Sequence, residues 1–176
     1  MEKNNTRLIA FDIINRFEKN NSYLNILVFK NVLNSNLDVE SKNFISELVY
    51  GVVTWKKKID WIIDKFLIRK NKWLEVDVRN LLRLGIYQLL FLSGIKDYAS
   101  VNETVEVAKI LKGKKCAGFV NGILRAVSRN KDKIEFPEIE KDTIKGISIN
   151  FSHPEWMIKR WIKRYGLNNT VNLCKY

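Results

Sequence analysis

This sequence contains very few of the residues on which most catalytic and metal sites depend. It has one histidine, His153, and two cysteines, Cys116 and Cys174, which lie far apart in the chain. These residues offer no metal-ligand spacing, and two cysteines are too few for the disulfide framework of a secreted domain. The eight glycines occur singly, so there is no phosphate-binding glycine loop. The sequence therefore does not predict hydrolytic, metal-dependent or nucleotide-cofactor chemistry in this segment.

Long hydrophobic runs and a signal sequence are also missing. The N-terminus, MEKNNTRLIAF, has polar and acidic residues where a signal peptide needs an apolar core. The most apolar stretch, Val78–Leu92, contains Arg79 and Arg83 and is shorter than the roughly 20 residues that a membrane-spanning helix requires. We expect a cytoplasmic protein with no membrane partner.

Acidic residues are in the minority. Lys and Arg total 31 against 19 Asp and Glu, which gives a formal net charge of +12. Residues 1–50 are balanced, with six basic and six acidic side chains, whereas residues 51–70 have six basic and two acidic ones. An excess of this size favours a polyanionic partner, and RNA or DNA is the interpretation we prefer over a merely solvated surface.

Helical periodicity is present through residues 1–130 and predicts an all-α bundle. A first helix is expected over about residues 7–19, with Thr6 as its N-cap, and a second over about 24–33. A third should begin after a cap at Asp38 or Ser41, and a fourth should run over about 55–66. Lys65, Arg69 and Lys70 are expected off the apolar face of the last of these. Val78–Leu92 is apolar almost all round, so it should be the buried helix around which the others pack.

Two more helices are predicted after this central one. Ser100 and Glu103 form a capping-box pattern for a helix that ends at Gly113, and another helix begins near Lys114. Gly118 and Gly122 share one face of it, where another helix backbone could approach closely, and Gly85 suggests a similar crossing. We interpret Asn121 as a side chain that ties this helix to a neighbouring loop or helix end, with ligand contact as the alternative.

The pattern changes after residue 130. We divide the chain into a helical domain (1–130), a charged linker (131–150) with a short extended piece over Ile147–Phe151, and the truncated start of a further region (151–176). Ser152 and Glu155 predict the start of an amphipathic helix. His153 is interpreted as an extended residue before Pro154 rather than as a catalytic group.

The basic residues are the only plausible functional surface that the sequence indicates. They cluster at one predicted helix start, around one turn, and on one face of the last bundle helix. Such clusters are typical of phosphate contact. The candidate RNA-binding residues are Arg7, Lys56, Lys57, Lys58, Lys112, Lys114, Lys115, Arg125 and Arg129.

Three segments resemble a known family. LLRLGIYQLLFL, VNETVEVAK (Val101–Lys109) and GFVNGILR (Gly118–Arg125) resemble the NusB fold, an RNA-binding bundle of two packed helical subdomains. FISELVYGVVTWKKKIDWII (Phe44–Ile63) and FSHPEWMIKRWIKRYG (Phe151–Gly166) are similar to the NusB-like domain of ribosomal RNA cytosine-C5 methyltransferases of the RsmB (Sun, Fmu) type, and to the segment that follows it.

This resemblance implies an RNA-binding accessory domain that helps to position a catalytic domain on small-subunit (16S) ribosomal RNA. S-adenosylmethionine and the catalytic cysteines are expected only in that C-terminal methyltransferase domain, because Cys116 and Cys174 do not lie in the Pro-Cys and Thr-Cys contexts of the family; Cys116 is expected to be a core residue. The segment itself should have neither cofactor nor catalysis. The alternatives are a stand-alone antitermination-like module, with a ribosomal protein as a further partner, and a helical brace that binds no RNA.

Overall fold

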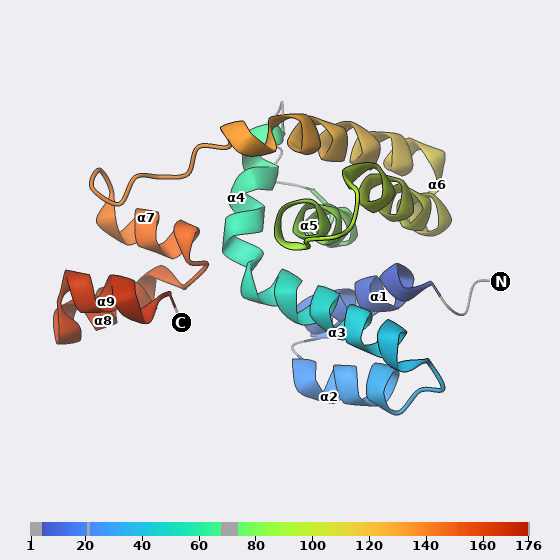
Figure 1. Cartoon of the computed structure of the whole chain (residues 1–176), viewed down its shortest axis with the longest axis horizontal. Coiled ribbons are helices and arrows are strands. Elements are labelled where there is room, and N and C mark those ends of the chain that lie inside the picture. Colours follow the sequence, from blue (N-terminus) through green and yellow to red (C-terminus); the bar gives the residue numbers. More distant parts are fainter. Residues whose placement is uncertain (1–4, 21, 68–73, 176) are drawn as a thin grey trace.

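The computed structural model describes residues 5–20, 22–67 and 74–175, which form helices, turns and irregular segments without a strand (Figure 1). Arg69 and Lys70 lie outside the described residues. None of the described helices is both long enough and apolar enough to cross a membrane. The helices are α1 (Thr6–Asn20), α2 (Leu24–Val28) with a π-helical continuation (Phe29–Leu33), α3 (Val39–Thr54), α4 (Lys56–Phe66), α5 (Val76–Phe91), α6 (Asp97–Asn130), a 3-10 turn (Lys131–Lys133), α7 (Thr143–Asn150), α8 (Glu155–Tyr165) and α9 (Leu167–Leu173).

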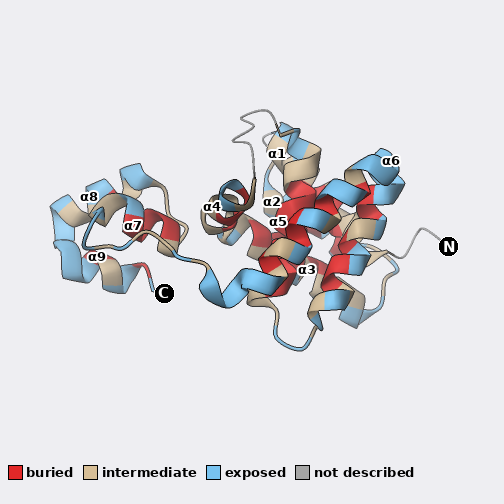
Figure 2. Cartoon of the chain, turned by 90° about the horizontal axis from the view of Figure 1, so that it is seen from above, coloured by how far each residue is buried: buried red, intermediate tan, exposed pale blue. Residues whose placement is uncertain are grey.

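Helix α5 is the centre of the bundle, as its sequence predicts. It packs against α1, α3, α4 and α6, which surround it in Figure 1. Leu81, Leu82, Leu84 and Ile86 are fully buried, and the buried residues of the bundle concentrate around this helix in Figure 2. The apolar pattern on both flanks of the helix is thus explained by neighbours on several sides.

The predicted close crossing at Gly85 is confirmed. A Cβ atom on Gly85 would lie 2.5 Å from Cδ1 of Leu124, a fully buried side chain of α6. Glycine at this position lets the two helices approach, at the cost of about 1 kcal/mol of helix propensity relative to alanine. The close crossing expected at Gly118 and Gly122 is wrong, because a Cβ atom on either would meet no atom of the described residues within 4 Å.

Gly85→Val is expected to destabilise the protein by roughly 1–3 kcal/mol, because the added methyl groups overpack the contact with Leu124. Gly118→Val is the matched control, since the same side chain enters open space on an exposed part of a helix. Urea unfolding followed by circular dichroism measures both. Equal losses of unfolding free energy would contradict the difference in packing.

Helix α6 consists of two arms that meet at Gly113. This glycine has φ 80° and ψ 178°, a left-handed conformation that interrupts the helix. The predicted helix end at Gly113 is therefore confirmed. The predicted cap at Ser100 is wrong, because the first arm already begins at Asp97, and Ser100 is a buried residue within it.

The first helices begin and end close to the predicted positions. Asn5, not Thr6, caps α1: its Oδ1 accepts hydrogen bonds from the backbone N–H groups of Arg7 (3.1 Å) and Leu8 (3.2 Å). Asp38 caps α3 by accepting from the N–H of Ser41 at 2.8 Å, one of the two predicted possibilities. The local capping chemistry of α1 therefore lies one residue earlier than expected.

Helices α7, α8 and α9 form a second, smaller hydrophobic cluster. Its buried side chains are Ile147, Ile158 and Cys174. The extended piece expected over Ile147–Phe151 is wrong, because residues 143–150 form α7. Asp142 accepts from the N–H of Lys145 at 3.2 Å and caps this helix, so part of the charged segment predicted as a linker is helical.

Ser152 connects this cluster to the bundle. Its Oγ accepts hydrogen bonds from the backbone N–H groups of Lys57 (2.9 Å) and Lys58 (3.4 Å), at the first turn of α4. The prediction that Ser152 caps α8 is therefore wrong; α8 follows Pro154 and has no side-chain cap. The Ser152 side chain instead satisfies free N–H groups of a helix almost a hundred residues earlier.

Lys58 strengthens the same junction. Its Nζ donates to the carbonyl oxygen of Asn150 at 3.3 Å, and lies 5.3 Å from the ring centroid of Trp55 and 4.6 Å from that of Phe136. Burial lowers the pKa of Lys58. The ammonium group is thus held between two aromatic rings at the junction, as a structural cation–π contact.

Candidate nucleic-acid interface

Four of the nine predicted RNA-binding residues use their side chains to contact other segments of the fold. Arg7 is the most enclosed: its Nε donates to Oε1 of Gln88 at 2.7 Å, its guanidinium lies over the Phe44 ring, and NH1 is 3.8 Å from the Glu103 carboxylate. Burial lowers the pKa of Arg7. These contacts give Arg7 a structural role between α1, α3, α5 and α6.

Lys56 and Lys112 belong to ion pairs. Nζ of Lys56 lies 2.6 Å from the Glu18 carboxylate. Nζ of Lys112 lies 2.8 Å from Glu75 and 2.9 Å from Asp77, and these two carboxylates raise the pKa of Lys112. With Arg7 and the enclosed Lys58, they form the group whose charge is already partnered within the fold.

The other five predicted residues have no carboxylate partner among the described residues. They are Lys57, Lys114, Lys115, Arg125 and Arg129. Lys114 and Lys115 follow the break at Gly113, and both arginines lie towards the end of the second arm of α6. Whether any of the nine contacts RNA stays a prediction.

Spacing places three of these cations on one side of the second arm. Lys115, Gly118, Gly122, Arg125 and Arg129 follow one another at intervals of three or four residues, which is the repeat of one helix face. All five are exposed. We call this set the α6 basic face; its two glycines leave helix backbone open between Lys115 and the arginines, where a ligand backbone can approach closely.

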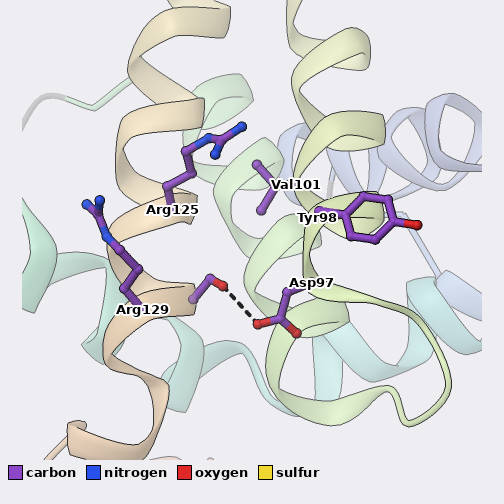
Figure 3. A pocket seen from close by; sticks show the side chains of 6 residues that line it. Asp97, Tyr98, Val101, Arg125 and Arg129 are labelled. Atoms are coloured by element: carbon purple, nitrogen blue, oxygen red, sulfur yellow. Dashed lines mark hydrogen bonds between the residues drawn. The ribbon is translucent and has the colours of Figure 1, made fainter.

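A hollow of about 350 Å³ lies beside the arginines, between the two arms of α6 (Figure 3). It is lined by Asp97, Tyr98, Val101, Arg125, Ser128 and Arg129. Figure 3 shows the arginines projecting from one arm, and Asp97, Tyr98 and Val101 lying on the other. Tyr98 is an exposed aromatic side chain at this hollow. It is not among the residues predicted from the sequence, in which only its position near a helix start could have indicated it.

The single carboxylate of the hollow does not neutralise the arginines. Asp97 accepts from Oγ of Ser128 at 2.8 Å and is paired with Lys131 at 3.1 Å. Burial of the Asp97 carboxylate raises its pKa, but Ser128 and Lys131 lower it by more, so that the pKa of Asp97 is lowered overall. Arg125 donates from Nε to Oδ1 of Asn121 at 2.9 Å, in the same helix. The hollow therefore presents two cationic groups and an exposed tyrosine.

The Asn121 contact corrects the prediction for that residue. Its amide oxygen orients Arg125 within one helix, and no described hydrogen bond ties it to another loop or helix end. Asn121 therefore supports the position of a basic residue on the α6 basic face, rather than the packing of the bundle.

The residues considered for chemistry lie elsewhere. Within the described ranges, no group of three His, Cys, Asp or Glu side chains is placed to hold a metal ion. His153 lies two residues before α8, and its ring packs edge-on against Trp161 with centroids 5.5 Å apart. Cys174 is buried, while Cys116 is partly buried against the main core, and burial raises the pKa of both thiols.

Comparison with known proteins identifies the bundle. The sequence model of the NusB family matches residues 4–129. The chain belongs to the NusB family. The match runs from α1 to Arg129, the next-to-last residue of α6, and includes the α6 basic face and the hollow beside it. Helices α7–α9 lie outside it.

Several curated relatives are ribosomal RNA methyltransferases. The chain is 36% identical over 99% of its length to a probable ribosomal RNA small subunit methyltransferase B of Bacillus subtilis (strain 168). It is 30% identical over 93% of its length to ribosomal RNA small subunit methyltransferase B of Escherichia coli O1:K1 / APEC. The chain spans only 38% and 36% of the length of these two proteins. The similarity extends past residue 129 and so includes most of α7–α9.

Solved structures support the NusB fold. A crystal structure of the antitermination factors NusB and NusE in complex with dsRNA aligns with 73% of this chain and 98% of its own, with a TM-score of 0.65 and 27% identity. A structure of T. maritima NusB aligns with 76% of this chain and 96% of its own, with a TM-score of 0.65 and 28% identity. The NusB-family region thus corresponds to nearly the whole of each of these chains.

Proposed function

We propose that this NusB-family chain is an RNA-binding unit of a ribosomal RNA small-subunit methyltransferase. The observation that carries the proposal is the α6 basic face: three cations without a carboxylate partner among the described residues, beside open helix backbone and a hollow with an exposed tyrosine. Cations of this kind bind phosphate without reading sequence, so they position a protein on RNA rather than choose a nucleotide.

The similarity to ribosomal RNA small subunit methyltransferase B supports the choice of RNA as the polyanion. The chain spans about two-fifths of that relative, so we propose that the reaction takes place in a separate catalytic region, which would bind S-adenosylmethionine. In this arrangement the NusB-family region supplies phosphate contacts, and α7–α9 connect it to the catalytic region. Lys114 adds positive charge next to Lys115, and Lys57 is a further cation at the first turn of α4.

Titration of the chain with a fluorescent fragment of small-subunit rRNA tests this function. If the five cations without a described carboxylate partner each contact a phosphate, affinity should fall by roughly 10²- to 10³-fold between about 50 mM and 200 mM salt, because bound counterions are released on binding. A neutral polymer of similar size is the negative control. Absence of binding at the lowest salt would refute the RNA-binding function.

A second candidate function, docking of a protein partner, is favoured by an apolar stripe on α2 and its π-helical continuation. Tyr23, Ile26, Phe29 and Leu33 are exposed at intervals of three or four residues, an arrangement that a bundle interior does not require. One structural relative is a NusB bound to NusE and dsRNA. Repeating the titration with and without NusE separates the two functions: an antitermination-like module should bind NusE, whereas the methyltransferase unit should bind rRNA without it.

A further inference from the structure

Helix α8 has a dense group of basic side chains that the α6 basic face does not include. Lys159, Arg160, Lys163 and Arg164 lie within six consecutive residues, and all four are exposed. None forms an ion pair with a carboxylate in the described part of the chain. The helix lies beyond residue 129, where the NusB-family match ends.

An exposed tryptophan lies on the same side of the helix as these cations. Ile158 is buried in the second hydrophobic cluster, formed by α7, α8 and α9, which we call the C-terminal cluster. Trp161 and Ile162 are partly buried against it, and these residues define the inner side of α8. Trp156, Arg160 and Lys163 are spaced i, i+4 and i+7 on the opposite side. Trp156 is 62% exposed, so its indole face is available to a planar ligand.

The requirements of the fold do not explain this arrangement. Lys159 with Lys163, and Arg160 with Arg164, are like-charge pairs four residues apart, which destabilise a helix slightly. A favourable interaction with the helix dipole accounts only for the basic residues of the last turn, Lys163 and Arg164. Elsewhere in the chain, exposed cations such as Arg16 and Lys141 have carboxylate partners at 2.9 Å.

The position of α8 relative to the bundle is defined by contacts already described. Ser152, three residues before the helix, caps α4, and Lys58 bonds the carbonyl of Asn150. A ligand that contacts both the bundle and α8 therefore meets two surfaces that these contacts link, and such a link lowers the entropic cost of binding both.

We propose that α8 is a second RNA-contact surface, which binds a single-stranded segment of RNA. One base stacks on Trp156, and the adjoining phosphates contact Arg160 and Lys163, with Lys159 and Arg164 extending the positive surface. An aromatic face flanked by cations is the chemistry by which proteins hold single strands without reading their sequence. The proposal rests on the proposed RNA-binding function. It adds a second RNA-binding site and a preference for single-stranded over duplex RNA.

An anionic membrane would be attracted to the same charges, but α8 lacks the free apolar side that a surface-bound helix inserts into lipid. That side is occupied by the C-terminal cluster around Ile158. Aromatic stacking on Trp156 also has no counterpart in binding to a bilayer surface by charge alone. RNA is therefore the partner that the exposed tryptophan and the cations fit together.

The test compares two double variants and one single variant of the 176-residue chain. Arg160→Gln with Lys163→Gln should reduce affinity for a single-stranded rRNA fragment roughly tenfold or more, and should reduce the slope of log affinity against log salt by about 1.4. Arg16→Gln with Lys141→Gln removes the same charge from exposed ion-paired positions, and should change neither. Trp156→Ala should weaken binding to single-stranded RNA by roughly 5- to 150-fold, and to a duplex much less.

The outcomes separate this proposal from the function on which it rests. If the wild-type chain binds rRNA but the α8 double variant and Trp156→Ala bind as tightly as the Arg16 and Lys141 control, the α8 proposal is overturned and the RNA-binding function stands. If the wild type binds no RNA, both fail. Sedimentation with phosphatidylserine vesicles that depends on Trp156, with no effect of the variant on RNA affinity, would also overturn the proposal in favour of a membrane.

Discussion

Replacing Arg125 and Arg129 together with glutamine is expected to lower affinity for small-subunit rRNA roughly 10- to 100-fold, because two charge-assisted contacts to phosphate are lost. The slope of log affinity against log salt should become shallower by about two, close to one for each phosphate contact. Filter binding or fluorescence anisotropy at several salt concentrations measures both quantities.

This pair should have a large effect because neither guanidinium has a carboxylate partner in the part of the chain that the structure describes. Arg125 donates to the neutral amide of Asn121, and the nearby Asp97 is already engaged by Ser128 and Lys131. Binding RNA therefore does not require an existing ion pair to be broken. By contrast, Lys112 would have to leave Glu75 and Asp77 before it could contact phosphate.

That contrast supplies the controls. Lys112→Gln should cost stability with little change in the salt slope, and Asn121→Ala should weaken RNA binding modestly, because Arg125 loses the group that orients it. Thermal melting checks that each variant is folded. If Lys112→Gln lowers the salt slope as much as the arginine pair does, the division of the basic residues into partnered and unpartnered groups is wrong.

Much of the bundle could be predicted from sequence because its determinants are local. The buried central helix follows from apolar residues on both flanks of residues 78–92, and the helix end at Gly113 follows from one glycine between charged residues. Both are confirmed. The close approach at Gly85 was predicted on the same grounds as one at Gly118 and Gly122, yet only Gly85 has a neighbour. A glycine in a helix shows that another element could pack closely against that position. It does not show whether an element does so, or which one.

The candidate interface was less predictable, because the partner of a charged side chain is set by the tertiary fold. In the sequence, Lys56 is grouped with Lys57, and Lys112 with Lys114. In the fold, however, Lys56 pairs with Glu18, 38 residues away along the chain, and Lys112 pairs with Glu75, 37 residues away. Ser152 shows the same limit. Its spacing from Glu155 fits a local cap, whereas the fold brings it to the start of α4. In the sequence the α8 cations alternate with apolar residues, but only the burial of Ile158 shows which side of the helix is free.

Asp60→Ala is expected to reduce the free energy of unfolding by roughly 3–5 kcal/mol, the cost of leaving a buried charge without its main partner. Arg83 of α5 is almost fully buried, and its Nε and NH2 donate to the two oxygens of Asp60 at 2.8 and 2.7 Å. Burial alone would lower the pKa of Arg83, but Asp60 and Glu18 together raise it. Because an arginine side chain is not deprotonated in proteins, the guanidinium stays charged in the core after the substitution.

Asp64→Ala is the matched control, because Asp64 lies one turn later on the same helix and its side chain is 59% exposed. Its pair with Arg79, at 3.0 Å, should contribute only about 0–1 kcal/mol, since water screens the exposed carboxylate of Asp64. Guanidinium unfolding of the two variants measures the difference. Glu18 remains 3.4 Å from NH1 of Arg83, so the loss for Asp60→Ala should lie at the lower end of the range and should grow when Glu18 is also replaced. Equal, small losses for Asp60→Ala and Asp64→Ala would mean that water reaches Arg83 and that this ion pair does not hold α4 against α5.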